Sequence, residues 1–372
     1  MANILGVQTV NGIWVIESDT NPTLGGGLSA PIGSIVSASD GSGLFQKTGA
    51  LDTDYAQIQN SGSVSGFNVL LVRKNPQVGQ YATIEDAINA ITLPSDTNRY
   101  LISVGVGEFL ENELTLPTYT SIVGASIQET VISPIGNHNL FHLTDVFNEI
   151  SFCSLQSVPL GFSAVFCDDS GDYAQLHKVN FVDCDTNVKV VATTQDTIIY
   201  MEYCDVNGVM TYGTYQDGSN GFRATINTEN WYSFPSASGF TCNYLTGADA
   251  KLIINTAGIY GNASPDLPPV LGNFGIVCQD GASVTISGAE INGFEQGLKN
   301  NNTGTGCDIH ITSASFGNNI NFDINILHPN TTGGFIGDAT LSKIFIDNSS
   351  NFTPVFTDQL GNGGLTIVGD IY

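Results

Sequence analysis

The sequence has little positive charge, and this limits the partners that it can bind. Ten Lys and Arg residues face 35 Asp and Glu residues, so the 372-residue chain carries a formal net charge of −25. A surface of this charge repels the phosphates of nucleic acids and anionic membrane headgroups at long range. We therefore expect no nucleic-acid partner, whereas a divalent cation such as Ca²⁺ is compatible with the acidic surface.

Long apolar segments and paired cysteines are also missing. No run of about 20 apolar residues occurs, so we expect no transmembrane helix and no membrane insertion. The first residues, Met1 to Ile4, contain no basic segment followed by an apolar core, and no secretory signal is therefore expected. The seven cysteines include no Cys-x-x-Cys pair, which argues against a disulfide framework or a zinc site. We predict that they are inert core residues.

Glycine and short apolar segments are abundant. The 42 glycines accompany many Asn, Thr and Ser residues, and 41% of the residues are hydrophobic. Gly and Asn tolerate positive φ in turns and Thr favours pleated strands, so the composition predicts an all-β fold of short strands. A Ser- and Gly-rich segment at 61–66 marks the end of a first, β-rich domain, residues 1–70. Within this domain, residues 43–55 predict a β-hairpin.

One amphipathic helix is expected, near residues 83–92. Apolar residues at 84, 87, 88 and 91 lie on one helical face, and Thr83 is the expected N-cap with Asp86 three positions later. A single helix directly before an array of strands is typical of a cap over the open end of a solenoid core. We therefore treat residues 71–372 as the second domain.

Short strands separated by polar turns follow the helix. Their sequences, in order, are ISVGVGEFLEN at 102–112, LTLP at 114–117, SIVGAS at 121–126 and ETVI at 129–132. An apolar and aromatic pattern ending in Cys then recurs at about the spacing of solenoid coils, at 150–153, 164–167, 179–184 and 200–204.

This order resembles the first coils of pectate lyase-like and pectin methylesterase-like β-helices, and the same opening occurs in phage tailspikes. The resemblance implies a right-handed parallel β-helix for residues 71–372. A β-sandwich is the structural alternative, because it also contains many short strands.

The resemblance to phage tailspike and fibre proteins also implies a function. It implies a structural virion appendage (a tail fibre, tailspike or head fibre of a bacteriophage) that attaches to the host surface. Residues 1–70 would anchor it to other virion proteins, the β-helix would form a homotrimer, and a host glycan or receptor would be bound. Location in the virion, after assembly in the host cytoplasm, is expected. A polysaccharide depolymerase and a cell-surface carbohydrate-binding protein are the alternatives.

Whether the chain is an enzyme depends on its carboxylates. The Gly-x-x-Asp-Phe-Ile-Phe-Gly element of pectin methylesterases is missing, and no arginine lies in the Arg-x-Pro-x-x-Arg arrangement of pectate lyases, so the catalytic residues of these families are not carried over. A glycoside hydrolase needs only two suitably spaced carboxylates, which neighbouring coils can supply. The candidates recur at similar points of successive coils: Asp168, Asp169, Asp183, Asp185, Glu202 and Asp205. A solvated acidic ridge is the other interpretation.

Two further sets of residues are candidates for ligand binding. Asp168, Asp169 and Asp172 surround a glycine and are a candidate Ca²⁺ site, although they lack the spacing of a calcium loop; no other cofactor is expected. Aromatic pairs are candidates for stacking on sugar rings, or equally for packing in a loop or subunit contact: Tyr212 with Tyr215, and Trp231 with Tyr232.

Overall fold

In the computed structural model the chain is almost entirely β and forms two compact units. The first comprises residues 1–70 and 97–101, and the second comprises residues 71–96 and 102–372. The structure describes all residues except 1–3, 11–12, 19–21, 24–27, 39–42, 52, 54, 59–66, 144–146, 169–172, 209–210, 236–237, 263–267, 269–270, 301–304, 313, 318, 320, 327–331, 338–342, 347–350, 357–365 and 368–372.

The first unit contains a five-stranded sheet. Its strands, in spatial order, are β1 (Ile4–Val10), β2 (Ile13–Ser18), β3 (Ile35–Ala38), β4 (Gly43–Lys47) and β5 (Tyr55–Ile58). Strands β2 and β3 are parallel, and the other neighbours are antiparallel. Strands β4 and β5 form the hairpin predicted at 43–55. Tyr55 packs with Ile16, Leu28, Val36 and Phe45, so this unit has an apolar core of its own.

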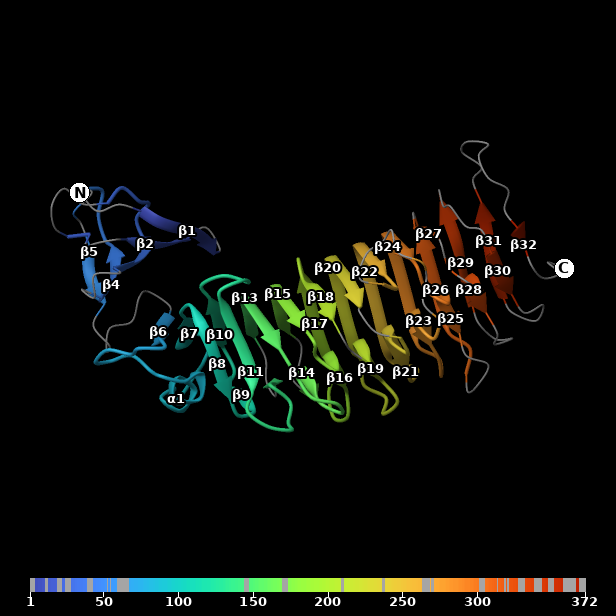
Figure 1. Cartoon of the computed structure of the whole chain (residues 1–372), viewed down its shortest axis with the longest axis horizontal. Helices are drawn as coiled ribbons and strands as arrows, with labels where there is room; N and C mark the ends of the chain where they lie inside the picture. The colour runs from blue at the N-terminus through green and yellow to red at the C-terminus, as the bar shows by residue number, and fades with distance from the viewer. Residues whose placement is uncertain are drawn as a thin grey trace. The chain divides into compact units, whose positions relative to one another are not determined.

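The remaining strands are short and follow one another along the chain (Figure 1). Their bounds are β6 (Phe67–Val72), β7 (Arg99–Val104), β8 (Gly107–Glu111), β9 (Leu114–Leu116), β10 (Thr120–Gly124), β11 (Thr130–Pro134), β12 (Phe141–Leu143), β13 (Asn148–Gln156), β14 (Ser163–Asp168), β15 (Ala174–Val182), β16 (Thr186–Val191), β17 (Thr197–Glu202), β18 (Asp205–Gly208), β19 (Tyr212–Asp217), β20 (Ala224–Pro235), β21 (Thr241–Thr246), β22 (Ala250–Tyr260), β23 (Phe274–Cys278), β24 (Ser283–Asn292), β25 (Gln296–Asn300), β26 (Asp308–Thr312), β27 (Ser315–Gly317), β28 (Phe322–Ile326), β29 (Thr332–Gly337), β30 (Lys343–Ile346), β31 (Asn351–Phe356) and β32 (Thr366–Ile367).

These strands build a parallel β-helix. A 16-stranded sheet has the main order β31-β29-β26-β24-β22-β20-β17-β15-β13-β10-β7-β6, and β8, β11, β18 and β27 pair beside this path. An 11-stranded sheet has the order β32-β30-β28-β25-β23-β21-β19-β16-β14-β12-β9. Strands from successive coils pair in parallel, for example β13 with β15 and β14 with β16. The predicted β-helix is confirmed, and the β-sandwich is excluded because sandwich sheets are antiparallel.

Helix α1 (Ile84–Asn89) packs against β8 and β9 of the first coil. Thr83 is its N-cap, as predicted, and the Thr83 hydroxyl accepts a hydrogen bond from the Asp86 amide at 3.0 Å. The helix is shorter than the predicted 83–92, because the amide of Ile91 bonds three residues back to Ile88 and tightens the last turn. The buried carboxylate of Glu111 accepts the Ile84 amide at 2.8 Å. In the described part of the chain, no helix is long and apolar enough to span a membrane.

A bend with positive φ divides the longest strands into two halves. In β20, residues 224–229 pair with β17 and residues 232–235 pair with β18, while Asn230 between them has a φ of 51°. Equivalent residues of successive coils form a corner ladder: Phe152, Lys178, Tyr203, Asn230, Thr256 and Gly288. We call the strands before the corner the first face, the strands after it the second face, and the 11-stranded sheet the third face.

The core of the β-helix is made of stacked apolar side chains. Ile122, Ile150, Leu176 and Met201 occupy partnered positions on successive strands of the first face, and each is at most 1% exposed. The cysteines belong to this core, since all seven are buried and none forms a disulfide. Burial raises the pKa of the thiols of Cys184, Cys204 and Cys242 to about 12, which keeps them in the unreactive thiol form. The predicted core location of the cysteines is confirmed.

Candidate functional site

The predicted acidic residues are spread over different parts of the coil. Glu202 lies on the first face, Asp205 on the second face and Asp168 at the end of β14 on the third face. Asp183 and Asp185 lie in the turn that follows the second face, where Asp183 has a φ of 52°. Among the five that the structure describes, no two occupy partnered positions on neighbouring strands. The prediction that these acids lie at similar points of successive coils is therefore wrong for these five, and Asp169 lies outside the described residues.

Two of these carboxylates are engaged in local contacts. The Asp185 carboxylate accepts the Gly161 amide at 2.8 Å and the Thr211 hydroxyl, so it ties two turns of neighbouring coils together. Asp168 pairs with Nε2 of His142 on the preceding strand of the third face. Both carboxylates have a structural role, because their oxygens bind to neighbouring groups of the fold.

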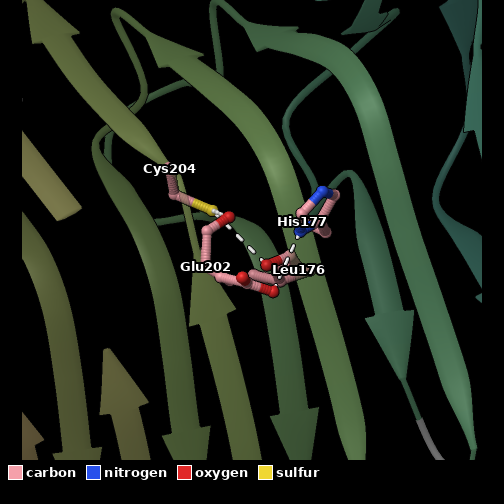
Figure 2. Close-up of polar contacts among 4 residues, drawn as sticks. All are labelled: Leu176, His177, Glu202 and Cys204. Atoms are coloured by element: carbon pink, nitrogen blue, oxygen red, sulfur yellow. Dashed lines mark hydrogen bonds and ion pairs between the residues drawn. The ribbon is translucent and has the colours of Figure 1, made fainter. Parts of the chain in front are cut away.

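Among the predicted acids that the structure describes, Glu202 belongs to a cluster of three titratable groups. It is partnered with His177 across β15 and β17, and Nδ1 of His177 lies 3.1 Å from Oε2 of Glu202 (Figure 2). Glu149 of β13 also acts on His177 electrostatically, one strand further along the same face. The first face thus carries two carboxylates beside one imidazole, on three successive strands.

The environment of Glu149 favours its protonated form. Burial raises the pKa of this carboxyl, and this effect exceeds the opposite effects of the Ser151 hydrogen bond and of a charged His177. A carboxyl whose pKa is raised holds its proton to a higher pH than an ordinary glutamate does, and this is a property of general acids. Chemically, the cluster combines a carboxyl with a raised pKa, Glu149, with an imidazole, His177, and a second carboxylate, Glu202.

The corner ladder brings aromatic rings and a lysine to this cluster. The Lys178 ammonium lies 5.1 Å from the centre of the Phe152 ring and 5.9 Å from that of Tyr203. The His177 ring makes edge contacts with the same two rings, at 5.5 and 5.9 Å. Phe152, Lys178 and Tyr203 all have φ values between 52° and 54°, a conformation that favours Gly or Asn. Bulky side chains occupy these corners despite the local backbone strain.

Cys204 lies close to this cluster in sequence but faces the other way. Its Sγ lies 3.6 Å from the backbone oxygens of Leu176 and Glu202, inside the coil (Figure 2). The corner at Tyr203 separates the outward Glu202 from the buried Cys204. The thiol is therefore no part of the surface site.

The candidate calcium site is not assembled by the residues that the structure describes. Asp169 and Asp172 lie outside the described residues, and Asp168 pairs with His142. Over the described ranges, no group of three or more His, Cys, Asp and Glu side chains has an arrangement that could hold a metal ion.

The aromatic candidates have different environments. Trp231 is 0% exposed and lies in the core between Cys204 and Ala257 of the neighbouring coils. Its indole cannot stack on an external sugar, so the prediction is corrected for this residue. Tyr232 is 39% exposed, because it is the next residue along the strand and points to the opposite side.

Tyr212 and Tyr215 belong to a ladder of side chains on the third face. Phe166, Lys189, Tyr215 and Tyr244 occupy partnered positions on β14, β16, β19 and β21. The Lys189 ammonium lies 5.7 Å from the centre of the Phe166 ring and 5.3 Å from that of Tyr215, and the rings of Tyr215 and Tyr244 stack at 5.3 Å. The Tyr212 ring meets both tyrosines at 5.4 Å. These half-buried side chains form a continuous aromatic surface.

Sequence reasoning missed Glu149, His177 and Tyr244. None lies in a recognisable motif, and each becomes significant only through its partner on the next coil. A signal was nevertheless present, because Glu149, Gln175 and Tyr200 occupy partnered positions 25 or 26 residues apart. An exact alignment of the coils would have placed Glu149 near His177.

Comparison of the sequence with known protein families gave no match, and neither did comparison with curated proteins. Among solved structures, the fold is similar to the A-module of a mannuronan C-5 epimerase from Azotobacter vinelandii, with 12% identity, 78% of this chain and 91% of that chain covered, and a TM-score of 0.41. It is also similar to ORF18 of Geobacillus virus E2, with 12% identity, coverage of 88% and 69%, and a TM-score of 0.41. Carrot pectin methylesterase gives 12% identity, coverage of 80% and 91%, and a TM-score of 0.40. At such low identities no activity is transferred to this chain.

Proposed function

We propose that this protein is a structural appendage of a bacteriophage particle whose β-helix attaches to a glycan on the host surface. The observation that carries the proposal is the aromatic ladder of the third face, formed by Phe166, Lys189, Tyr212, Tyr215 and Tyr244. Aromatic rings with nearby polar groups suit sugars, which have apolar ring faces and hydroxyl edges. Successive coils are hydrogen-bonded to one another and repeat about every 4.8 Å, so the aromatic side chains form an extended row on a fixed backbone.

The division of the chain into two units supports an anchoring role for residues 1–70. This part has its own five-stranded sheet and its own core, so it does not depend on the β-helix core for burial. A separately folded β unit can bind other virion proteins while the coils remain available to the host. A homotrimer, the usual closed arrangement for such appendages, is part of the proposal.

Four measurements test this function. Antibodies against the full-length protein should label purified virions, and the protein should compete with virions for adsorption to host cells. Its solution mass should be about 118 kDa, three times the chain mass of 39.3 kDa. Tyr215→Ser should weaken host binding by about tenfold, the loss of one stacking contact. Tyr119→Ser, on a different aromatic stack, is the matched control. Absence of both virion labelling and host binding would contradict the proposal.

A depolymerase is the second candidate, and the cluster of Glu149, His177 and Glu202 favours it. Glycoside hydrolysis requires a protonated carboxyl and an ionised carboxylate flanking the bond, and the raised pKa of Glu149 suits the first role. Release of reducing ends from host capsular polysaccharide is the direct assay. Glu149→Gln and Glu202→Gln should each abolish the release, whereas Glu229→Gln, next to Glu202 on β20, should not. Unchanged activity in both test variants would exclude this cluster.

A further inference from the structure

The second face holds an unusual glycine in the middle of strand β22. Gly258 lies between the buried Ala257 and Ile259, so its missing side chain would point outward. A Cβ at this position would lie 2.8 Å from Cδ1 of Tyr232 and 2.9 Å from Cε2 of Tyr260. The rings of these two tyrosines therefore lie over Gly258 and fill the place of a side chain.

The backbone does not require a glycine at this position. Gly258 is not among the glycines with positive φ, and β22 pairs in regular register around it, to Ile259 with β20 and to Tyr260 with β24. A glycine inside a strand weakens the strand, and it often marks a place where another group approaches closely. Because Gly258 has no side chain, the rings of Tyr232 and Tyr260 pack directly against the backbone of the sheet.

Carboxylates lie at both ends of this aromatic surface. In the row of partnered outward positions, Asp205 precedes Tyr232, and Glu290 follows Gly258. The Tyr260 hydroxyl donates a hydrogen bond to Oε2 of Glu290 at 2.9 Å, and the Asn292 amide donates to Oε1 of Glu290. Neighbouring strands are about 4.8 Å apart, so the row from Asp205 to Glu290 spans roughly 14 Å. Two carboxylates thus frame the two rings, and the Glu290 carboxylate is held in place by hydrogen bonds.

The rings contribute little to the core, which indicates a role at the surface. Tyr232 is 39% exposed, and the inner side of its strand is filled by the buried Trp231 and Ser233. Tyr260 stacks on Phe234 of the preceding coil at 5.2 Å with an angle of 13° between the planes, so its orientation is fixed from behind. A fixed ring, an exposed ring and a carboxylate oriented by hydrogen bonds form a preorganised surface.

We propose that Tyr232, Gly258, Tyr260, Asp205 and Glu290 form a binding site for a short oligosaccharide of neutral or amino hexoses. This inference rests on the proposed glycan attachment. It adds a second glycan-binding surface, on the second face, and specifies the class of sugar that is bound. The rings bind the apolar face of a pyranose, and the two carboxylates accept hydrogen bonds from hydroxyl or amino groups. The same carboxylates, on a chain with a net charge of −25, repel sugars that carry carboxylates.

The test uses the full-length protein and immobilised oligosaccharides of glucose, galactose, mannose, glucosamine and galacturonate. We expect binding to at least one neutral or amino oligosaccharide and none to galacturonate. Gly258→Ala pushes the two rings apart without altering any hydrogen-bonding group, and should weaken this binding at least about tenfold. Gly136→Ala is the matched control, because a Cβ there meets no atom closer than 3.6 Å.

The outcomes separate this inference from the proposed function. Host-cell adsorption by the wild-type protein, together with unchanged sugar binding by Gly258→Ala, would overturn the second-face site alone. Binding confined to galacturonate would also overturn it. Absence of both host adsorption and sugar binding in the wild-type protein would overturn the proposed function as well. Circular dichroism of Gly258→Ala confirms that any loss of binding comes from a folded β-helix.

Discussion

Replacement of Trp231 offers a stringent test of the core arrangement. Its side chain is fully buried between Cys204 and Ala257, two small residues that leave room for an indole on the coil between them. Truncation of a buried Trp to Ala costs about 3–5 kcal/mol, the sum of lost transfer free energy and the remaining cavity. The indole Nε1 has no hydrogen-bond partner among the described residues, and a buried unpaired donor costs about 1–3 kcal/mol.

Two substitutions separate these contributions. Trp231→Ala should lower the free energy of unfolding by about 3–5 kcal/mol. Trp231→Phe loses some volume but also removes the unpaired donor, so its cost should be only about 1 kcal/mol. Urea unfolding should be followed by circular dichroism, because Trp231 is one of two tryptophans and its replacement alters the fluorescence signal. An equal loss in both variants would refute the reasoning, because it would mean that Nε1 forms a stabilising hydrogen bond.

Further predictions concern the corner ladder, the cap and the cysteines. Thr256 is β-branched and has a φ of 55°, so Thr256→Asn should stabilise the protein by up to about 1 kcal/mol in urea unfolding; destabilisation would contradict the strain argument. Burial raises the pKa of Glu111 in the folded protein. The protonated Glu111 carboxyl therefore contributes to the free energy of unfolding below the pKa of the unfolded chain, and this contribution is lost as the pH rises through the pKa of the folded state. The stability of Glu111→Gln relative to wild type should therefore increase over that interval, and the opposite slope would refute this sign. All seven cysteines are buried, so a thiol reagent such as DTNB should modify them only after denaturation; rapid modification of the native protein would show an exposed thiol.

Local sequence patterns were sufficient to predict the fold class and the start of the helix. The apolar positions of a six-residue helix, with Thr83 as the cap, are determined by neighbours within one turn. The glycine content and the recurring short strands indicated an all-β fold, and the resemblance of the first coils to pectate lyase-like β-helices implied the parallel β-helix. The burial of the cysteines also followed from their position beside apolar residues. These features depend on interactions between residues that are close together in the sequence.

Only the tertiary structure decided which side chains face outward and which of them meet. Each corner residue with positive φ interrupts the alternation of the strand, so Glu229 points outward and Trp231, two residues later, points inward. A regular alternation would place both on the same side. The turns also differ in length, so the strand partners of Glu202 are His177 and Glu229 rather than any of the predicted acids. The register of the coils, which local propensity does not specify, therefore determines the candidate site.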